Sequence, residues 1–500
     1  MIRRLGLGLC VMLAACTAAR AEPAKVRVEG GVLVGEVTDL AEVFRDIPYA
    51  APPVGPLRWA PPRKPAAWKG ERDAVKPGVS CPQPMRPDGA PNFGGANGPA
   101  SEDCLHLNVY APKAGKKAPV MVWLHGGGHL YGAGWVYDGR AFARDGVVLV
   151  TINYRLGALG YFAHPALTKA AGRADPLGDY GLMDQIAALQ WVKRNIAAFG
   201  GDPANVTLFG ESAGGASTLA LLATPSAKGL FAKAIVESGG GWSAPSGLAK
   251  AEAKGVAMAD KLGLPGASAT LAQLRALPVD AIVKASTMTG PFVDGRLMTE
   301  TPAQAFADGH AIDVPLIIGS NSGEDSLMAG ETLLGAEGKV AIPQDLRGVY
   351  AAEAARSEDA LARAVFTDRA FGAPARWIAA RASGGAPSWL YHFSYVGTRF
   401  RPALTRAFHA AEIQYVFEYW GRRTPMSVVS DEDKAMAIRM HGCWVDFART
   451  GAPCSDWPAY DPAGDRLMSF GGEGVLTGFR KTELDAQEAW ALPKLGLAPN

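Results

Sequence analysis

Short, mostly apolar runs alternate along this chain with longer segments in which hydrophobic residues recur at helical spacing. The short runs are typical of strands buried on both faces, and they are Val120–Leu124, Val147–Asn153, Val206–Phe209, Ala234–Val236, Val314–Ile318 and Trp389–Phe393. Between them, Asp184–Phe199 has the spacing of an amphipathic helix and stops before Gly200. This alternation predicts a fold of the α/β class, in which a large, mostly parallel central sheet is covered by helices on both faces.

The pattern also indicates how the chain is organised between these elements. Residues 241–310 and 324–385 are rich in Ala and have helical spacing, so we expect them to be insertions over one end of the sheet. The Pro- and Gly-rich stretches 48–65 and 82–99 are predicted to be surface loops, because strand and helix patterns resume directly after them. A length of 500 residues would allow about three domains, but α/β enzymes often keep such a chain in one unit. We expect residues 22–500 to form a single domain.

The first residues have the features of an export signal. Met1–Arg4 carries positive charge, Leu5–Ala15 is an apolar stretch too short to span a bilayer, and Ala19–Ala21 fits an A-x-A cleavage site. We therefore predict a signal peptide over residues 1–21 and a periplasmic or secreted protein. A lipoprotein anchored through Cys16 is the alternative, since Leu13–Cys16 resembles a bacterial lipobox. No later segment is apolar for long enough to be a transmembrane segment.

Composition narrows the possible partners. The chain is 48% hydrophobic and 20% charged, which excludes a disordered, collagenous or coiled-coil protein. Its 50 basic and 48 acidic residues give a formal charge of +2, so the chain lacks the basic field that nucleic-acid binding requires. Lys113, Lys116 and Lys117 form the one notable basic cluster, and we interpret it as a solvated loop.

The cysteines agree with export. After the two cysteines of the leader are set aside, Cys81, Cys104, Cys443 and Cys454 remain as two pairs that are local in sequence. We predict the disulfides Cys81–Cys104 and Cys443–Cys454, with buried free thiols as the alternative. The chain has no C-x-x-C or H-E-x-x-H spacing, so we expect no metal site.

The segment Asn205–Gly215 carries the most informative motif. It reads NVTLFGESAGG, in which a predicted strand runs into G-x-S-x-G and then into a helix. Gly210 and Gly214 would let neighbouring backbone pass close to a tight strand-to-helix turn, which would lift the Ser212 hydroxyl into a cleft. This context predicts a nucleophilic serine, although an ordinary turn also fits so short a motif.

A second glycine-rich turn follows the first predicted strand of the sheet. His125–His129 reads HGGGH, and glycines at such a position let backbone N–H groups approach a substrate and stabilise an oxyanion. A plain flexible turn is the alternative. We interpret His125 and His129 as turn residues and not as metal ligands, because three glycines would break the helix that such spacing needs.

Several motifs occur in the order and at the separations of one family. They are Asp46–Ala50 (DIPYA), Glu102–Val109 (EDCLHLNV), the HGGG turn, Asn153–Gly157 (NYRLG), Gly181–Gln185 (GLMDQ), the GESAGG segment, Phe408–His409 and the stretch 444–453. Over about residues 30–458 the chain resembles the type-B carboxylesterases, which belong to the α/β-hydrolase superfamily and include the cholinesterases. The resemblance implies an α/β-hydrolase fold and hydrolysis of carboxylic esters through an acyl-serine intermediate. The sequence has no metal, nucleotide or flavin motif, so we expect no cofactor.

The resemblance also assigns the other site residues, which spacing alone does not select from eight histidines. His409 matches the family's general base, and Glu324 matches its acid. The family usually has Gly after this acid, and Asp325 stands there instead, so Asp325 could share the role. The resemblance further implies an oxyanion hole built from the backbone N–H groups of Gly127, Gly128 and Ala213.

Residues around this site follow from the same comparison. Glu211 is expected to be a carboxylate facing the site, and Ser238 is either a hydrogen-bond partner of the catalytic residues or a plain strand-end serine. The resemblance supports the Cys81–Cys104 bridge, and it implies a salt bridge between Glu102 and Arg155.

Two other functions remain open on the sequence. A catalytically silent adhesion or binding module would keep this scaffold, and a lipase would act on long-chain lipid esters. The presence of Ser212, Glu324 and His409 argues against the silent module. Residues 82–103 contain no Trp that could bind a choline cation, which disfavours choline esters. Trp242 could line an acyl pocket, but a core or surface position is the more ordinary interpretation. The partner predicted here is a small-molecule ester.

Overall fold

The computed structural model describes residues 23–242, 246–328, 342–421, 424–472 and 474–499. The predicted signal peptide and the alternative anchor at Cys16 lie outside the described residues. Within these ranges, every helix is too short or too polar to cross a bilayer.

One large sheet runs through the molecule. Its order is β1-β2-β3-β5-β7-β6-β8-β9-β10-β11-β12-β13, with β4 beside β2. The strands from β7 to β12 along this order pair in parallel, whereas β1, β2, β3 and β5 at one edge and β13 at the other pair antiparallel. The strands are β1 Ala24–Val28, β2 Gly31–Val37, β3 Glu42–Pro48, β4 Glu71–Asp73, β5 His106–Ala111, β6 Ala118–Leu124, β7 Val148–Ile152, β8 Gly201–Glu211, β9 Lys233–Glu237, β10 Leu316–Asn321, β11 Ser388–Phe393, β12 Arg466–Phe470 and β13 Gly474–Thr477.

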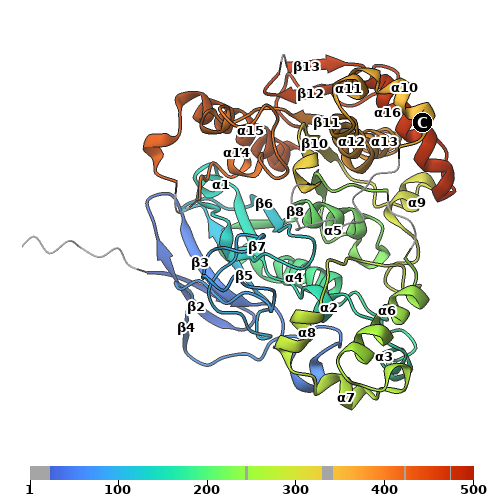
Figure 1. Ribbon diagram of the computed structural model, residues 1–500. Helices are drawn as coiled ribbons and strands as arrows, with labels where there is room; N and C mark the ends of the chain where they lie inside the picture. Colours follow the sequence, from blue (N-terminus) through green and yellow to red (C-terminus); the bar gives the residue numbers. More distant parts are fainter. Residues whose placement is uncertain (1–22, 243–245, 329–341, 422–423, 473, 500) are drawn as a thin grey trace, which may run out of the picture.

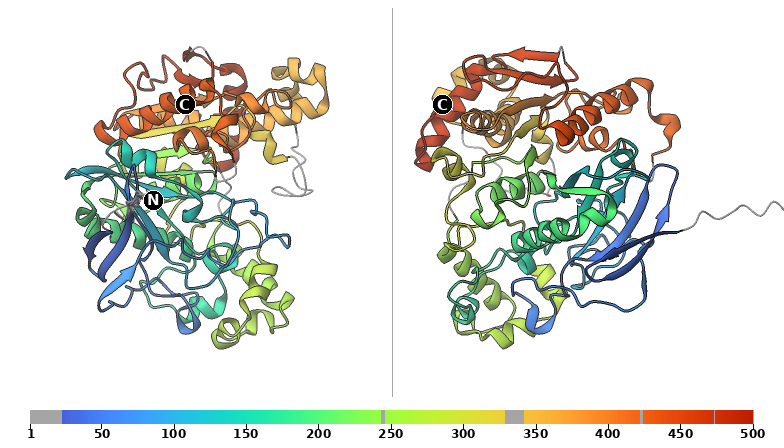
Figure 2. Two further views of the ribbon diagram at one scale, coloured as in Figure 1. Left: turned by 90° about the vertical axis from the view of Figure 1, so that its left-hand side faces the viewer. Right: turned by 180° about the vertical axis from the view of Figure 1, so that it is seen from behind.

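Helices cover both faces of this sheet, as Figures 1 and 2 show. They are α1 Arg140–Arg144, α2 Gly157–Gly160, α3 Pro165–Ala170, α4 Tyr180–Asn195, α5 Ala213–Leu222, α6 Leu248–Lys261, α7 Leu271–Arg275, α8 Val279–Ala285, α9 Pro302–Ala307, α10 Gln344–Val349, α11 Ala351–Arg356, α12 Glu358–Thr367, α13 Ala373–Ala382, α14 Ile413–Val416, α15 Asp431–Thr450 and α16 Lys481–Ala491.

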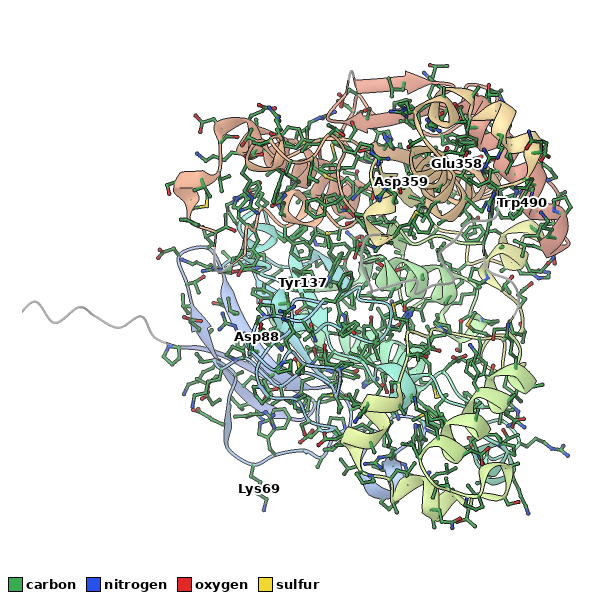
Figure 3. The ribbon with its side chains drawn as sticks, viewed as in Figure 1. Lys69, Asp88, Tyr137, Glu358, Asp359 and Trp490 are labelled. Carbon is green, nitrogen blue, oxygen red and sulfur yellow. A yellow bond between two sulfur atoms is a disulfide. The ribbon has the colours of Figure 1, made fainter. Side chains whose placement is uncertain are left out.

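The central strands β6, β7 and β10 are mostly apolar because successive side chains enter different cores. In β6, Val120 and Val122 face the core that also holds residues of α4, α5 and α13, whereas Met121 and Trp123 face the core beneath α1 and α15. Tyr137 packs on Trp123 in the second core, with ring centroids 5.0 Å apart, while Lys69 extends away from the body (Figure 3). Burial on both faces therefore explains why the sequence shows continuous apolar runs and not alternation.

The predicted fold class is confirmed. Every apolar run named from the sequence overlaps a strand of the parallel part of the sheet, although the run 314–318 begins two residues before β10, and the helix predicted over Asp184–Phe199 is present as α4 and a following 3₁₀ turn. This helix begins earlier, at Tyr180, and the chain reverses at Gly200 with a φ of 81°.

The two Ala-rich insertions lie in different parts of the molecule. Helices α6, α7 and α8 occupy the lower right of Figure 1, whereas α11, α12 and α13 lie at the top. Their connecting segments nevertheless meet at one cavity, where Pro291 and Met298 come from the first insertion and Ala370 and Phe371 from the second.

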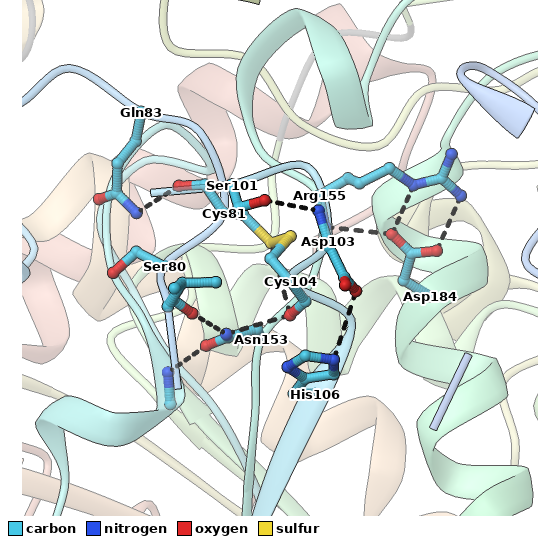
Figure 4. The surroundings of a disulfide bond; sticks show 12 residues. Ser80, Cys81, Gln83, Ser101, Asp103, Cys104, His106, Asn153, Arg155 and Asp184 are labelled. Atoms are coloured by element: carbon cyan, nitrogen blue, oxygen red, sulfur yellow. Dashed lines mark hydrogen bonds and ion pairs between the residues drawn. A yellow bond between two sulfur atoms is a disulfide. The ribbon is translucent and has the colours of Figure 1, made fainter. Parts of the chain in front are cut away.

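The structure joins the predicted cysteine pairs. Cys81–Cys104 closes the loop that precedes β5, and Cys443–Cys454 ties the end of α15 to the segment that follows it (Figure 4 shows the first).

The expected salt bridge between Glu102 and Arg155 is wrong. Glu102 pairs with Arg58, whose Nε lies 2.7 Å from Oε1, and Arg155 pairs with Asp184, whose Oδ2 lies 2.7 Å from Nε (Figure 4). Arg58 and Arg155 each bind their carboxylate through two nitrogens in a planar, bidentate geometry. A direct Glu102–Arg155 pair would break both of these bidentate contacts.

Candidate active site

The turn between β8 and α5 holds Ser212 in an unusual backbone conformation. Its φ is 55° and its ψ is −119°, a combination that costs a non-glycine residue about 1–3 kcal/mol. The backbone N–H of Ser212 donates to the carbonyl of Glu237 at 2.9 Å, which ties the turn to the end of β9. The hydroxyl therefore lies at the carboxyl ends of the parallel strands, where α/β sheets bind their ligands.

The glycines on either side of Ser212 are required by close backbone contacts. A Cβ on Gly214 would lie 1.9 Å from the carbonyl oxygen of Leu124, and one on Gly210 would lie 2.5 Å from the carbonyl carbon of Gly214. Neither backbone has room to move away without disturbing β6 or α5. The G-x-S-x-G spacing is thus a steric requirement of this turn.

The glycine-rich turn after β6 lies directly against Ser212. A Cβ on Gly126 would lie 3.1 Å from Cβ of Ser212, and Gly127 and Gly128 have φ values of 101° and 63°. Gly128 and Ala213 line the same cavity as Ser212. The structure thus brings together the two backbone segments that the sequence singled out.

Glu324 and His409 are in direct contact. The His409 Nδ1 atom lies 2.5 Å from Oε2 of Glu324, and both side chains are buried. Glu324 begins a short 3₁₀ turn after β10, and the backbone N–H of His409 donates to the Ser326 hydroxyl of that turn at 2.9 Å. These bonds fix the histidine loop on the turn that carries the acid.

The second oxygen of Glu324 is also held. Oε1 accepts hydrogen bonds from the Ser238 hydroxyl at 2.6 Å and from the backbone N–H of Asn321 at 2.7 Å. Ser238 therefore contacts the acid directly, as one of the two sequence interpretations expected. A carboxylate with donors on both oxygens keeps one orientation toward the imidazole.

Asp325 takes part in a different set of contacts. Its Oδ2 atom lies 2.8 Å from Nη2 of Arg406 and 3.1 Å from Nη1 of Arg363, and the side chain is buried. The carboxylate that meets His409 is therefore that of Glu324, and Asp325 anchors α12 and the loop before the histidine.

The imidazole of His409 lies between two carboxylates. Its Nε2 atom is 3.0 Å from Oε1 of Glu211, the residue next to Ser212. Burial by itself lowers the pKa of His409, but the charges of Glu211 and Glu324 outweigh burial and raise the pKa to about 9. This value is above the ordinary 6.5 that the sequence alone suggested.

A cavity of about 360 Å³ opens beside Ser212. Its walls include the apolar side chains Leu219, Trp242, Met298 and Phe371, and among the described residues that line it the one side chain that can carry a charge is the imidazole of His129. Burial lowers the pKa of that imidazole to about 4, so it is neutral near pH 7. Trp242 thus lines this cavity, which corrects the expectation of an ordinary core or surface position.

Elsewhere in the described residues, two clusters contain carboxylate and imidazole groups that could bind a metal ion. Within each cluster the possible ligand atoms lie within 4.8 Å of one another, and the clusters are Asp145, Glu418 and His441, and Glu300, Asp308 and His310. In the first group, Arg144 binds both carboxylates, so a positive charge already occupies that position. The second group is largely exposed. Neither group includes a residue of the cavity beside Ser212.

Comparison with known proteins agrees with this geometry. The model of the Carboxylesterase family matches residues 22–487. The chain belongs to the carboxylesterase family. The para-nitrobenzyl esterase of Bacillus subtilis (strain 168) is 36% identical over 465 residues, covering 87% of this chain and 92% of that protein. The fumonisin B1 esterase of Sphingopyxis macrogoltabida is 36% identical over 492 residues, covering 91% and 88%.

Solved structures of carboxylesterases have the same fold. A PNB esterase superposes with a TM-score of 0.79 at 32% identity and covers 92% of this chain and 99% of its own. A carboxylesterase of Geobacillus stearothermophilus gives a TM-score of 0.78 at 33% identity, with the same coverage. The protein is therefore a carboxylic-ester hydrolase of the α/β-hydrolase fold.

Three polar residues of this carboxylesterase site were not found from sequence. Asn321 donates to Glu324 and approaches Glu412, whose pKa is raised by burial to about 7. Trp444 Nε1 donates to Oε1 of the buried Glu237 at 2.8 Å, and burial also raises the pKa of Glu237. Asn321 and Glu237 end β10 and β9, and Glu412 lies in the turn before α14, and no local pattern distinguishes these three residues from surface residues.

Proposed function

We propose that Ser212 is the nucleophile of this esterase, that His409 is its general base, and that Glu324 orients the imidazole. The contact that carries this proposal is the one between His409 Nδ1 and Glu324 at 2.5 Å, with Nε2 facing the residue beside Ser212. Because the Nδ1 proton is donated to Glu324, Nε2 is the atom that accepts the serine proton during attack. Alcohol leaves from the tetrahedral intermediate, and water activated by His409 then hydrolyses the acyl-serine.

The oxyanion of this intermediate binds to the backbone N–H groups of Gly127, Gly128 and Ala213. The support for this assignment is that the two segments lie on either side of Ser212 at one cavity. Losing one such donor typically lowers kcat by about 10²–10³-fold. Glu211 and Ser238 act on the reaction through their contacts with His409 and Glu324.

The cavity supports a particular class of substrate. Apolar walls and the absence of charge among its described lining residues favour an uncharged, apolar acyl group. A volume of about 360 Å³ is at the small end of ligand pockets, which favours short acyl chains over the long chains of a lipase substrate. The reaction requires no cofactor.

The N-terminal residues and the disulfides bear on the cellular location of the protein. We infer that residues 1–21 direct export to the periplasm or the medium and that residues 22–500 form one hydrolase domain. Two disulfides support an oxidising compartment, and one family match over residues 22–487 supports a single domain. Acylation at Cys16 is the alternative, which mass spectrometry of the native N-terminus distinguishes.

The decisive experiment treats the mature protein and its Ser212→Ala variant with a phosphonylating ester mimic. Intact mass should show one adduct on the wild type and none on the variant, and p-nitrophenyl acetate turnover should be lost in both treated wild type and untreated variant. A folded wild type that is neither labelled nor active would favour the silent binding module. Turnover that rises steadily from acetate to palmitate esters would favour the lipase.

A further inference from the structure

His129, the residue after the three glycines, has both ring nitrogens engaged. Its Nδ1 atom lies 3.0 Å from the carbonyl oxygen of Thr289, and its Nε2 atom lies 2.9 Å from the Ser217 hydroxyl. The ring is 5% exposed and packs on Tyr161, with centroids 4.8 Å apart. The sequence predicted only a turn residue at position 129, whereas the structure shows a buried side chain with partners on both ring nitrogens.

The partners of the ring determine its tautomer. A carbonyl oxygen only accepts, so Nδ1 carries the proton and donates to Thr289, and Nε2 accepts from the Ser217 hydroxyl. The Ser217 oxygen in turn accepts from Gln185 Nε2 at 3.0 Å, which uses one of the two acceptor positions of the hydroxyl. His129 is neutral near pH 7, and its ring also interacts with the backbone of Ala213, the first residue of α5, while the Ser217 hydroxyl also interacts with Tyr161.

The hydrogen bonds of His129 and Ser217 connect the glycine-rich turn to α5, the two segments that lie beside Ser212. Gly127 and Gly128 belong to the same turn as His129, whereas Ser217 lies on α5, the helix that begins at Ala213. The turn is held from other sides as well, because the His129 carbonyl accepts from the Gly157 N–H at 2.6 Å and Met288 packs on Gly128. Of these contacts, the one between His129 and Ser217 joins the turn directly to α5.

We propose that His129 is a positioning residue, which sets the separation between the N–H groups of Gly127 and Gly128 and the N–H group of Ala213 through its bond to Ser217. This role rests on the proposed function, in which those N–H groups bind the oxyanion. A misplacement of about 1 Å is enough to lower a rate by about 10²-fold, so a hydrogen bond that fixes the two segments affects the transition state more than the bound ester.

The test removes the connection from each side. His129→Phe keeps a ring against Tyr161 and loses both hydrogen bonds, and Ser217→Ala removes the hydroxyl on α5. We expect kcat/KM for p-nitrophenyl acetate to fall about 10- to 100-fold in each variant, with KM within twofold of wild type. The double variant should lose no more than His129→Phe alone, because both changes break one connection.

Two inhibitors separate positioning from a general structural effect. A trifluoromethyl ketone adds the Ser212 oxygen to its carbonyl carbon, and the resulting oxyanion needs the N–H groups, so its affinity should fall by the same factor as kcat/KM. The corresponding non-reactive amide binds only as a ground-state ligand, and its affinity should stay unchanged. Thr218→Val, which removes a neighbouring buried hydroxyl whose one hydrogen bond within the described ranges goes to the Gly214 carbonyl, should behave as wild type.

Two outcomes overturn the proposal: kcat/KM within twofold of wild type in a folded His129→Phe variant, or equal losses of affinity for ketone and amide. Thermal unfolding verifies folding, and Ser217→Ala carries the same test if His129→Phe does not fold. Ser212→Ala is assayed in parallel, because turnover that survives in it would overturn the proposed function instead.

Discussion

At the residue scale, the charge around His409 determines how the enzyme responds to pH. The imidazole lies between Glu211 and Glu324, and a general base works only when it has lost its proton. A pKa raised to about 9 means that the base form, and with it kcat/KM, is lost as the pH falls through that value. Acidification therefore lowers activity from a higher pH than an ordinary histidine would.

Glu211→Gln tests this effect. The substitution removes a negative charge 3.0 Å from Nε2 and keeps the shape of the side chain, so the midpoint of kcat/KM against pH should move down from about 9 toward 6.5. Steady-state kinetics from pH 5 to 10 measures the midpoint. Glu432→Gln, at an exposed carboxylate paired with Arg401, is the matched control and should leave it in place.

The neighbouring acids Glu324 and Asp325 should respond differently to the same change. Glu324→Gln should lower kcat by about 10³–10⁴-fold, because the amide does not hold the imidazole in the required tautomer. Asp325→Asn should leave kcat within a few fold and should lower the free energy of unfolding by about 1–3 kcal/mol, since it weakens the ion pairs that the buried Asp325 carboxylate forms with the partly exposed Arg363 and Arg406. Kinetics and urea unfolding distinguish the two, and a large kcat loss in Asp325→Asn would contradict this assignment.

At the element scale, the strand-to-helix turn is held by backbone contacts on all sides. Gly214 at the start of α5 lies against the carbonyl of Leu124 at the end of β6, and Ser212 bonds to the end of β9. The neighbouring strands β6, β8 and β9 therefore position the N-terminal end of α5. The strain at Ser212 persists because these contacts leave the turn no relaxed alternative.

A pair of glycine substitutions tests this packing. Gly214→Ala would place a Cβ 1.9 Å from a backbone oxygen, so we expect a loss of about 1–3 kcal/mol in the free energy of unfolding and a large fall in kcat. Gly442→Ala, in the middle of α15 with open space around the new Cβ, should instead gain about 0.5–1 kcal/mol without changing kcat. Chemical denaturation measures both, and equal effects at the two positions would refute the steric explanation.

At the scale of the whole molecule, disulfides at distant places stabilise one fold. Cys81–Cys104 closes a loop with a sequence separation of 23, and Cys443–Cys454 closes one of 11. In the chain-entropy model each contributes about 3 kcal/mol by restricting the unfolded chain.

Removal of one disulfide should therefore lower the urea midpoint measurably. We expect the free energy of unfolding of the double variant Cys443→Ser with Cys454→Ser to be lower than that of the wild type by up to about 3 kcal/mol. Reductant should also lower the free energy of unfolding of the wild type. In the double variant, the further change in the urea midpoint that reductant causes measures the contribution of Cys81–Cys104. An unchanged midpoint in both would show that the bridges add nothing to stability.

Patterns along the chain were enough to predict the sheet, its covering helices and the tight turn at Ser212. These features are local: an apolar run fits a strand buried on both faces, and the glycines of G-x-S-x-G leave room for backbone atoms that would lie within 3 Å of a Cβ there. The family resemblance added Glu324 and His409, which no spacing selects, because residues 85 positions apart in the chain meet only through the fold.

The partners of the charged and polar groups could be identified only in the folded protein. Arg155 meets Asp184 and not Glu102, Asp325 binds arginines, and His129 bonds to Ser217 across 88 residues of chain. The energy of such contacts depends on geometry and desolvation at the meeting point, and a sequence specifies the residue types without giving either.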